Sequence, residues 1–248
     1  MLKIENTEVM GWEHAIRGMR NPKNSWDRSD SEFDGGMCSE CAYAEECEDR
    51  TDRYFRFNCL YLGPNDHKLM TALRDGGPVH AKYRRMITVY LDITAPLYWW
   101  KEYDTYKVGT VANSCSTMHK IHAKEFTLDD FSHEHMNSDS ERLLQTIVYE
   151  LNRARDSYIH CDNIDSNKVP HAPYCAKNYW WQMIQLLPSS YNQKRTVMLN
   201  YEVLANIYRW RRDHKLDEWH TFCDWIESLP YSELITGKVK GENNERTV

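Results

Sequence analysis

The sequence predicts a single α+β domain of mixed helices and strands, with a cysteine-rich segment inserted near its amino terminus. Three observations support this fold class. A short segment alternates apolar and polar residues, which indicates a half-buried strand, and several later segments repeat apolar residues at helical spacing. The third is a long polar stretch in which four of the eight cysteines lie between positions 38 and 59. We assign residues 1–235 to the domain, 24–60 to the insertion and 236–248 to a flexible tail.

Local patterns place the elements along the chain. Strands are expected where apolar residues alternate or cluster over a short stretch, at residues 3–10 and 86–93. Helices are expected at residues 11–19, 65–75, 97–106, 179–187, 196–212 and 216–229, and from 138 onwards. Asn65 is the expected cap of the second helix, and Ser138 with Glu141 forms a capping box. Residues 156–178 are polar and are expected to be irregular.

Composition limits the classes of function. The 248 residues carry a net charge of −6 and are 41% hydrophobic, which describes a globular chain. There is no run of about 20 apolar residues, so no membrane span is expected. Charges interrupt the amino-terminal segment where a secretory signal would be apolar, so we expect a cytoplasmic protein. The acidic balance argues against duplex nucleic acid as a partner.

The cysteines of the insertion have the spacing of a metal site. Cys38 and Cys41 form a C-x2-C pair, Cys47 follows six residues later, and Cys59 could complete a tetrahedron. Thiolates select zinc or an iron–sulfur cluster over hard cations. The alternative is a loop whose free thiols are incidental.

Two other clusters have weaker chemical signals. His119, His122, His133 and His135 could face one metal or phosphate, or form a solvated edge. The run Asn113-Ser114-Cys115-Ser116 suits close approach to a ligand and equally suits a tight strand. No Walker loop, G-x-G-x-x-G, G-x-S-x-G or H-E-x-x-H motif is present, which removes support for those enzyme classes.

Segments 80–119 and 183–220 together resemble the flavin-dependent thymidylate synthases of the ThyX type. HAKYRRM lies on the family's G-H-x-S-x-x-E-H element, and YKVGTVANSCSTMH lies on R-H-R-x-x-S-x-N-E-x-S-x-R-Y. MIQLLP lies on A-R-x-x-L-P, and NYEVLANIYRWR lies on the late N-x-R-S-L…F-x-x-L-R helix. The resemblance covers most of residues 65–230 and implies this family's single mixed helix and sheet domain, with the cysteine-rich segment as an insertion.

The resemblance also implies roles for individual residues. His80, Lys107, Asn113 and Asn200 would contact FAD, and Ser114, Cys115 and Ser116 would lie beside the nucleotide. Arg211 would bind the pyrimidine and act as the catalytic residue. The chain departs from the family where Tyr106-Lys107-Val108 replaces R-H-R, Met118-His119 replaces R-Y and Ile184 replaces the arginine of A-R-x-x-L-P. Two fixed charges that hold the nucleotide in the family are therefore missing.

These observations lead to three hypotheses. By resemblance, the chain is a homotetrameric enzyme for the reductive methylation of a pyrimidine nucleotide, dUMP to dTMP or a related substrate, with FAD, NADPH and methylene-tetrahydrofolate. The alternative is a catalytically inactive nucleotide- or protein-binding module on the same scaffold. The third is a small redox or iron–sulfur protein centred on the cysteines of residues 38–59.

Overall fold

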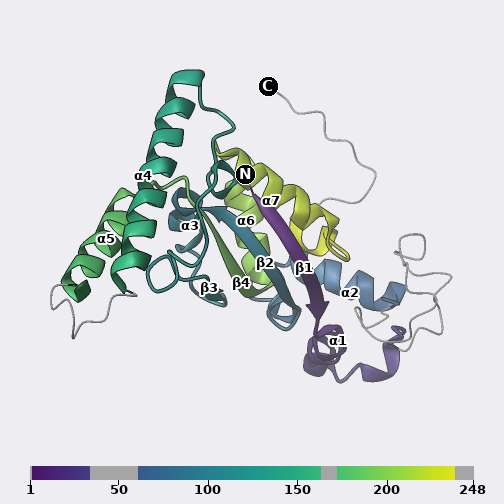
Figure 1. Ribbon diagram of the computed structural model, residues 1–248. Coiled ribbons are helices and arrows are strands. Elements are labelled where there is room, and N and C mark those ends of the chain that lie inside the picture. The colour runs from purple at the N-terminus through teal and green to yellow at the C-terminus, as the bar shows by residue number, and fades with distance from the viewer. Residues whose placement is uncertain (1, 34–60, 163–171, 238–248) are drawn as a thin grey trace, which may run out of the picture. The chain divides into compact units, whose positions relative to one another are not determined.

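The computed structural model describes residues 2–33, 61–162 and 172–237 (Figure 1). Its strands are β1 (Lys3–Met10), β2 (Thr88–Pro96), β3 (Val111–Ser114) and β4 (Asn192–Asn200). The helices are α1 (Trp12–Arg20), α2 (Pro64–Asp75), α3 (Leu97–Tyr103), α4 (Ser138–Asp162), α5 (Ala172–Leu186), α6 (Tyr201–Arg211), α7 (Asp217–Ser228) and α8 (Glu233–Thr236). Short 3-10 turns lie at Asn21–Lys23, Trp26–Arg28, Lys82–Arg85 and Leu128–Asp130. The predicted mixture of helices and strands is confirmed.

The strands form one sheet in the order β1-β2-β4-β3, so β4, the last strand in sequence, pairs between β2 and β3. The alternation that predicted a strand at residues 86–93 is confirmed, because every second side chain from Ile87 to Ile93 is buried. Side chains alternate between the two faces of a strand, so this pattern fixes the register of β2.

Backbone contacts divide the chain into two compact units. The first, here called the hairpin unit, contains Met1–Lys3, Ile93–Thr105 and Asn113–Arg195. The second, here called the α6 unit, contains Ile4–Asp92, Tyr106–Ala112 and Thr196–Val248.

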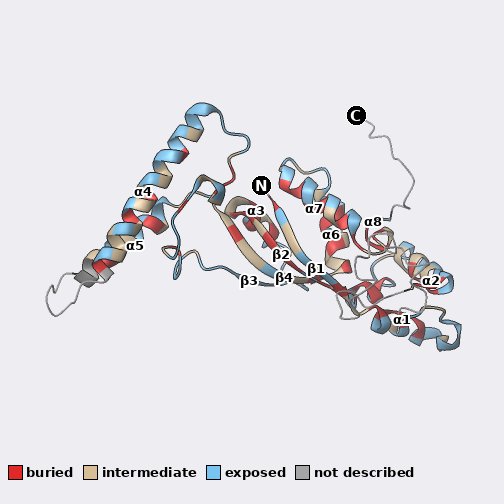
Figure 2. Ribbon diagram, turned by 45° about the vertical axis from the view of Figure 1, so that its right-hand side comes forward, coloured by how far each residue is buried: buried red, intermediate tan, exposed pale blue. Residues whose placement is uncertain are grey.

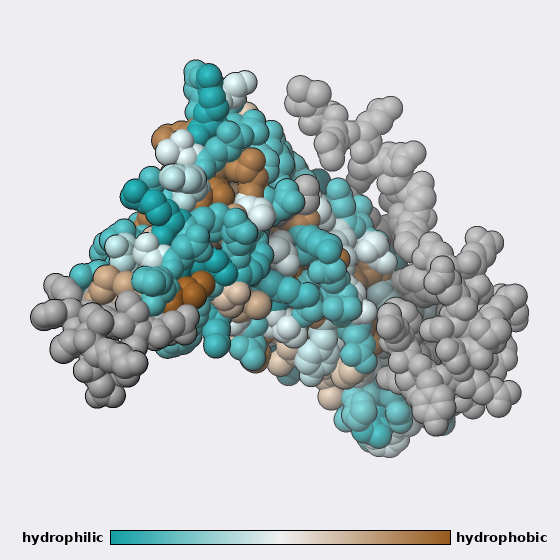
Figure 3. Space-filling model, in the orientation of Figure 1, coloured by the Kyte–Doolittle hydropathy of each residue, from teal (hydrophilic) through white to brown (hydrophobic). Residues whose placement is uncertain are grey.

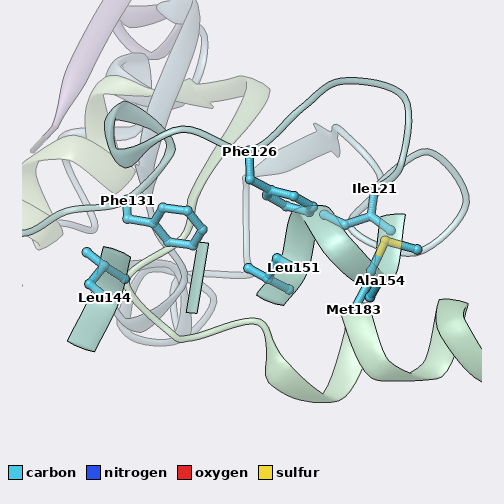
Figure 4. Packing of buried hydrophobic residues seen from close by; sticks show 7 residues of the cluster. All are labelled: Ile121, Phe126, Phe131, Leu144, Leu151, Ala154 and Met183. Carbon is cyan, nitrogen blue, oxygen red and sulfur yellow. The ribbon is translucent and has the colours of Figure 1, made fainter. Parts of the chain in front are cut away.

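In the hairpin unit, α4 and α5 pack against each other along their lengths (Figure 1). Figure 2 shows buried positions on one side of α4 and exposed positions on the other. The shared core contains aromatic and aliphatic side chains from both helices and from the loop that precedes α4: Ile121, Phe126, Phe131, Leu144, Leu151, Ala154 and Met183 (Figure 4). Large apolar residues such as Leu143 and Tyr149 remain exposed on α4, and Figure 3 shows brown patches among the hydrophilic surface there.

The hairpin unit also contains an aromatic cluster on α3. Trp99, Trp100 and Tyr103 contact one another with ring centroids 5.0–5.2 Å apart. The Arg195 guanidinium lies 4.1 Å from the centre of the Trp100 ring and forms an ion pair with Asp104 at 2.8 Å. These three buried aromatic side chains therefore serve packing, as aromatic side chains commonly do.

In the α6 unit, a buried ion pair joins the end of α1 to the start of α2. Arg20 Nε donates to Asp66 Oδ1 at 2.6 Å, and both side chains are almost fully buried. The other carboxylate oxygen of Asp66 accepts from the hydroxyls of Ser29 and Ser31, each at 2.7 Å. The carboxylate of Asp30 in turn accepts from the backbone N–H groups of Asn65 and Asp66. This network fixes residues 29–31 onto the first turn of α2.

The predicted cap of α2 is corrected by the same network. Gly63 occupies the cap position and Pro64 the first helical position, so Asn65 already lies inside the helix. Its expected capping role is taken by the carboxylate of Asp30, which lies far away in sequence, and sequence spacing gives no signal for such a partner.

The helix predicted at residues 196–212 is wrong in its first turn. Residues 196–200 belong to β4, where Val197 and Leu199 are fully buried, and the helix begins only at Tyr201. Five residues with one alternation are too few to distinguish a strand from a helix by periodicity alone.

The hairpin unit shows two further differences. The side chain of Asn137, not that of Ser138, caps α4, because Asn137 Oδ1 accepts from the Ser140 N–H at 2.9 Å. The irregular stretch expected over residues 156–178 is helical up to 162 and again from 172. Burial of Cys161 and Ala176 in the helix pair outweighs the local polarity that suggested a loop.

Cys38, Cys41, Cys47 and Cys59 lie outside the described residues, so the zinc or iron–sulfur site stays a prediction. Within the described ranges, no three His, Cys, Asp or Glu side chains gather as metal ligands would. None of the helices within those ranges has the length and apolar character needed to cross a bilayer.

The ion pair of Asp66 leads to a prediction about stability. Burial tends to raise the pKa of Asp66, but the hydrogen bonds from Ser31, Ser29, Arg20 and the Asp30 amide outweigh this and hold it below 3.8. The Asp66→Asn variant leaves Arg20 as a buried charge without its partner, which costs about 3–5 kcal/mol of unfolding free energy at pH 7. Urea titration measures this loss.

The matched control is Asp75→Asn, because Asp75 lies on the same helix but is 61% exposed in its pair with Arg74. We expect a change below about 1 kcal/mol there. Because the folded pKa of Asp66 is lowered, its contribution is complete above pH 3.8 and is lost as the pH falls further. Asp66→Asn should lack this acid-sensitive component, and equal losses in the two variants would contradict the prediction.

Candidate functional site

The residues predicted to bind ligands belong to both units. His80, Lys107, Asn200 and Arg211 lie in the α6 unit, and Asn113, Ser114, Cys115 and Ser116 lie in the hairpin unit. Within the α6 unit, the segment from Tyr106 to Gly109 contacts residues at both ends of α6.

Asn200 occupies the junction between β4 and α6. Its backbone is extended, and its side-chain oxygen accepts from the N–H groups of Glu202 and Val203 at 3.1 Å each. This is the arrangement of a helix N-cap, which satisfies two donors that the helix leaves unpaired. The carboxamide nitrogen Nδ2 is not used by the cap and can donate elsewhere.

A tight turn at residues 107–110 packs against this junction. The Thr110 N–H donates to the Lys107 carbonyl, and Gly109 has φ +79°, as the third residue of a type II turn requires. A Cβ atom at Gly109 would lie 3.2 Å from Asn200 Nδ2 and 3.1 Å from Val203 Cγ2. Glycine therefore allows the turn to approach α6 closely, while Val108 is 92% exposed and Lys107 is also exposed.

Arg211 lies at the other end of α6, between aromatic rings. Its Nε donates to the hydroxyl of Tyr106 at 2.9 Å. The guanidinium carbon lies 4.9 Å from the centre of the Trp219 ring and 5.5 Å from that of Tyr106. The two rings contact each other edge to face. The Arg211 guanidinium is permanently charged and half-buried, and hydrogen bonding and cation–π attraction fix the orientation of its plane.

Asn200 and Arg211, the two residues at α6 that are predicted to bind ligands, lie at opposite ends of the helix. Asn200 precedes the first residue of α6 and Arg211 is its last, so a rise of about 1.5 Å per residue separates their backbones by roughly 16 Å. Asn200 groups with the glycine turn, and Arg211 groups with Tyr106 and Trp219. Asn200 and Arg211 are therefore too far apart along the helix for both to contact one small aromatic ring.

His80 lies on the short connection between α2 and the 3-10 turn at Lys82–Arg85. Its imidazole is exposed and packs beside Gly76, and the backbone N–H of His80 donates to the Gly77 carbonyl. The neighbouring Tyr83 is buried and donates to the Met70 carbonyl, and burial raises the pKa of Tyr83 to about 12. The HAKYRR segment therefore contributes to packing through Tyr83, whereas His80 faces solvent.

The segment Asn113–Ser116 is exposed in the hairpin unit, not buried as a tight core strand would be. The Cys115 N–H donates to the Lys194 carbonyl, and Gln193 Nε2 donates to the Cys115 carbonyl at 2.7 Å. The Ser116 hydroxyl oxygen accepts from the N–H groups of Met118 and His119. It therefore closes a local turn.

The histidine cluster separates into individual contacts. His122 packs against the ring of Tyr158 with centroids 4.6 Å apart, and His133 Nδ1 lies 2.9 Å from the Phe131 carbonyl. His122 and His133 are both half-buried and are held by separate contacts, and among the described residues no three potential ligands gather around them.

Sequence reasoning missed the residues that position the two anchors. Tyr106 and Trp219 orient Arg211, and Gly109 brings the turn onto Asn200. The glycine after Lys-Val was a usable turn signal. The pairing of Tyr106 with a residue 105 positions away had no local signal.

The fold is similar to that of two solved structures of ThyX from Helicobacter pylori, each described as a complex with FAD and dUMP. One matches with a TM-score of 0.56 at 15% identity over 96% of this chain and 98% of that chain. The other matches with a TM-score of 0.57 at 16% identity over 96% and 100%. No protein-family model and no curated protein sequence matches the chain. The comparisons show a ThyX-like fold.

The geometry at Asn200 predicts different outcomes for two substitutions. Asn200→Ala removes the acceptor of two backbone donors and should cost about 1 kcal/mol of unfolding free energy. Asn200→Asp keeps an oxygen in place and adds a negative charge at the helix N-terminus, so it should be nearly neutral. Urea unfolding of both variants measures this difference, and an equal loss would show that the cap is not what Asn200 contributes.

Proposed function

We propose that the chain is a diverged flavin-dependent thymidylate synthase-like enzyme, which methylates dUMP to dTMP or acts on a related pyrimidine nucleotide. FAD, NADPH and methylene-tetrahydrofolate are the proposed cofactor and co-substrates. The observation that carries the proposal is the fixed guanidinium of Arg211 in a ThyX-like fold that extends over nearly the whole chain. The two similar ThyX structures are described as complexes with FAD and dUMP, which supports both ligands.

The residues around the glycine turn fit a flavin cofactor. Lys107 is an exposed cation on the turn, and the Nδ2 of Asn200 remains as a donor after the side-chain oxygen has capped α6. The close packing of Gly109 fixes this turn. Lys107 and Asn200 would hold FAD, with His80 and Asn113 as further predicted contacts. When bound, FAD supplies hydride transfer from NADPH to the one-carbon unit.

Arg211 has the properties needed to act on a pyrimidine. A guanidinium presents its donors in one plane, and two of them can bond in parallel to the acceptor edge of a uracil ring. In the proposal, the terminal nitrogens of Arg211 bind the base while its Nε donates to the Tyr106 hydroxyl. A fixed cation at that edge stabilises negative charge that develops on the ring when its C5 carbon reacts. The aromatic contacts with Trp219 and Tyr106 reduce the reorganisation that this stabilisation needs.

The nucleotide contacts of Ser114, Cys115 and Ser116 remain proposals, as do the tetramer and the cytoplasmic location. The exposed β3 end could admit a ligand, and the Ser116 O–H can still donate although its oxygen closes a turn.

One observation favours the alternative, a catalytically inactive nucleotide-binding module. Two arginines of the family's motifs are replaced in this chain, one within Met118-His119 and the other by Ile184. Each bidentate arginine–phosphate contact that is lost in this way is worth about 1.5–3 kcal/mol. Binding of a nucleotide monophosphate would then be weaker by roughly two to four decades.

The proposal predicts that Arg211→Ala abolishes turnover while FAD remains bound. Turnover is measured as release of the C5 hydrogen of dUMP with NADPH and methylene-tetrahydrofolate, and FAD is measured by its absorption in the purified protein. Loss of one preorganised donor typically reduces kcat by about 10²–10³, and loss of the whole cation should reduce it at least as much.

The control is Arg212→Ala, which removes an equal charge from the next residue, an exposed side chain paired with Asp213. Its turnover should stay within about twofold of the original. Asn200→Asp tests the cofactor separately, because it keeps the cap and should lower FAD retention. Bound FAD and dUMP without any turnover would support the inactive module, whereas unchanged turnover in Arg211→Ala would overturn the role of Arg211.

A further inference from the structure

Two cysteines outside the proposed site lie next to each other in the hairpin unit. Cys161 is near the carboxyl end of α4, and Cys175 is in the first turns of α5. Their sulfur atoms are 2.9 Å apart, and no disulfide joins them. A disulfide needs an S–S bond of about 2.05 Å, so a movement of less than 1 Å would bring the two sulfurs to bonding distance.

We propose that Cys161 and Cys175 form a reversible disulfide that joins the ends of α4 and α5. The two helices are already packed by a continuous apolar core that includes Leu151, Ala154 and Met183. Because this core holds the helices in place without the bond, the thiols are preorganised and the disulfide closes only the chain between them, a separation of 14 residues. The proposal does not rest on the function proposed above, since neither cysteine is among the residues assigned to a ligand.

The environments of the two sulfurs indicate which cysteine reacts first with an external oxidant. Cys175 is partly exposed, whereas Cys161 is buried. Cys161 donates its S–H to the Cys175 sulfur, and this hydrogen bond, together with burial, raises the pKa of Cys161. Cys161 is therefore held as a thiol, and Cys175 is the sulfur that an external reagent can reach first.

The chemistry is a thiol–disulfide exchange with a small disulfide such as oxidised glutathione. The Cys175 thiolate attacks one sulfur of the reagent, breaks its S–S bond and expels one glutathione thiolate. Cys161 then loses its proton and attacks the Cys175 sulfur of the mixed disulfide, expelling the second thiolate. The protein loses two electrons and two protons, and the reagent becomes two molecules of glutathione.

The test compares the full chain after treatment with oxidised glutathione and after treatment with a dithiol reductant. Peptide mapping without reduction should find one cross-linked species that joins the peptides of Cys161 and Cys175, lighter by two hydrogens than their sum. The midpoint of thermal unfolding should rise by several degrees on oxidation, because the bond restricts the unfolded chain.

Three variants make the test specific. Cys161→Ser and Cys175→Ser should each lose the cross-link and the thermal shift, and Cys161→Ser should instead accumulate a stable mixed disulfide on Cys175. Cys115→Ser, which removes an exposed thiol elsewhere, should keep both effects. The proposal is overturned if Cys175 stays reduced, if Cys161 pairs with another cysteine, or if the mixed disulfide persists in the unsubstituted protein.

Discussion

The change from strand to helix at Asn200 and Tyr201 is the constraint on which the α6 unit depends. Asn200 ends β4 and caps α6 through its side-chain oxygen, while the Tyr201 N–H donates to the Ile87 carbonyl just before β2. The Tyr201 ring is fully buried against Trp12, and its hydroxyl donates to the Pro230 carbonyl. One dipeptide thus joins the amino-terminal helix, the central strand and the carboxyl-terminal helices, and it sets the rotation of α6 about its axis.

That rotation decides which side chains of α6 are buried and which remain exposed. Leu204, Ile207 and Tyr208 are buried, so the helix is held in one orientation. Arg211, at the last position, then meets Tyr106 and Trp219, which come from a loop and from the next helix. The position of the cation is therefore determined by packing along the whole buried face of α6, together with the contacts of Tyr106 and Trp219.

The sequence was sufficient for the features that depend on local pattern. The alternation from Ile87 to Ile93 predicted β2, and the helical spacing of Leu144 and Leu151 predicted α4, because burial of one face leaves a period in the sequence. It was insufficient wherever a distant partner decides the outcome. Three features depend on such tertiary contacts. They are the capping of α2 by Asp30, the helical ends next to Cys161 and Cys175, and the contact of the Tyr106 ring with Arg211. The placement of β4 failed for a related reason, because a short strand and a helix start look alike before pairing is known.

The structure also separates residues that the fold needs from residues that only a ligand would explain. Gly109 and Asn200 have structural roles that any protein of this fold could require, since one permits a close turn and the other caps a helix. Their presence alone is therefore weak support for chemistry. Arg211 is different, because its guanidinium lies against the rings of Tyr106 and Trp219 and neither caps a helix nor permits a turn. The contacts with Tyr106 and Trp219 show how the cation is held, and a role for it on a ligand stays a proposal.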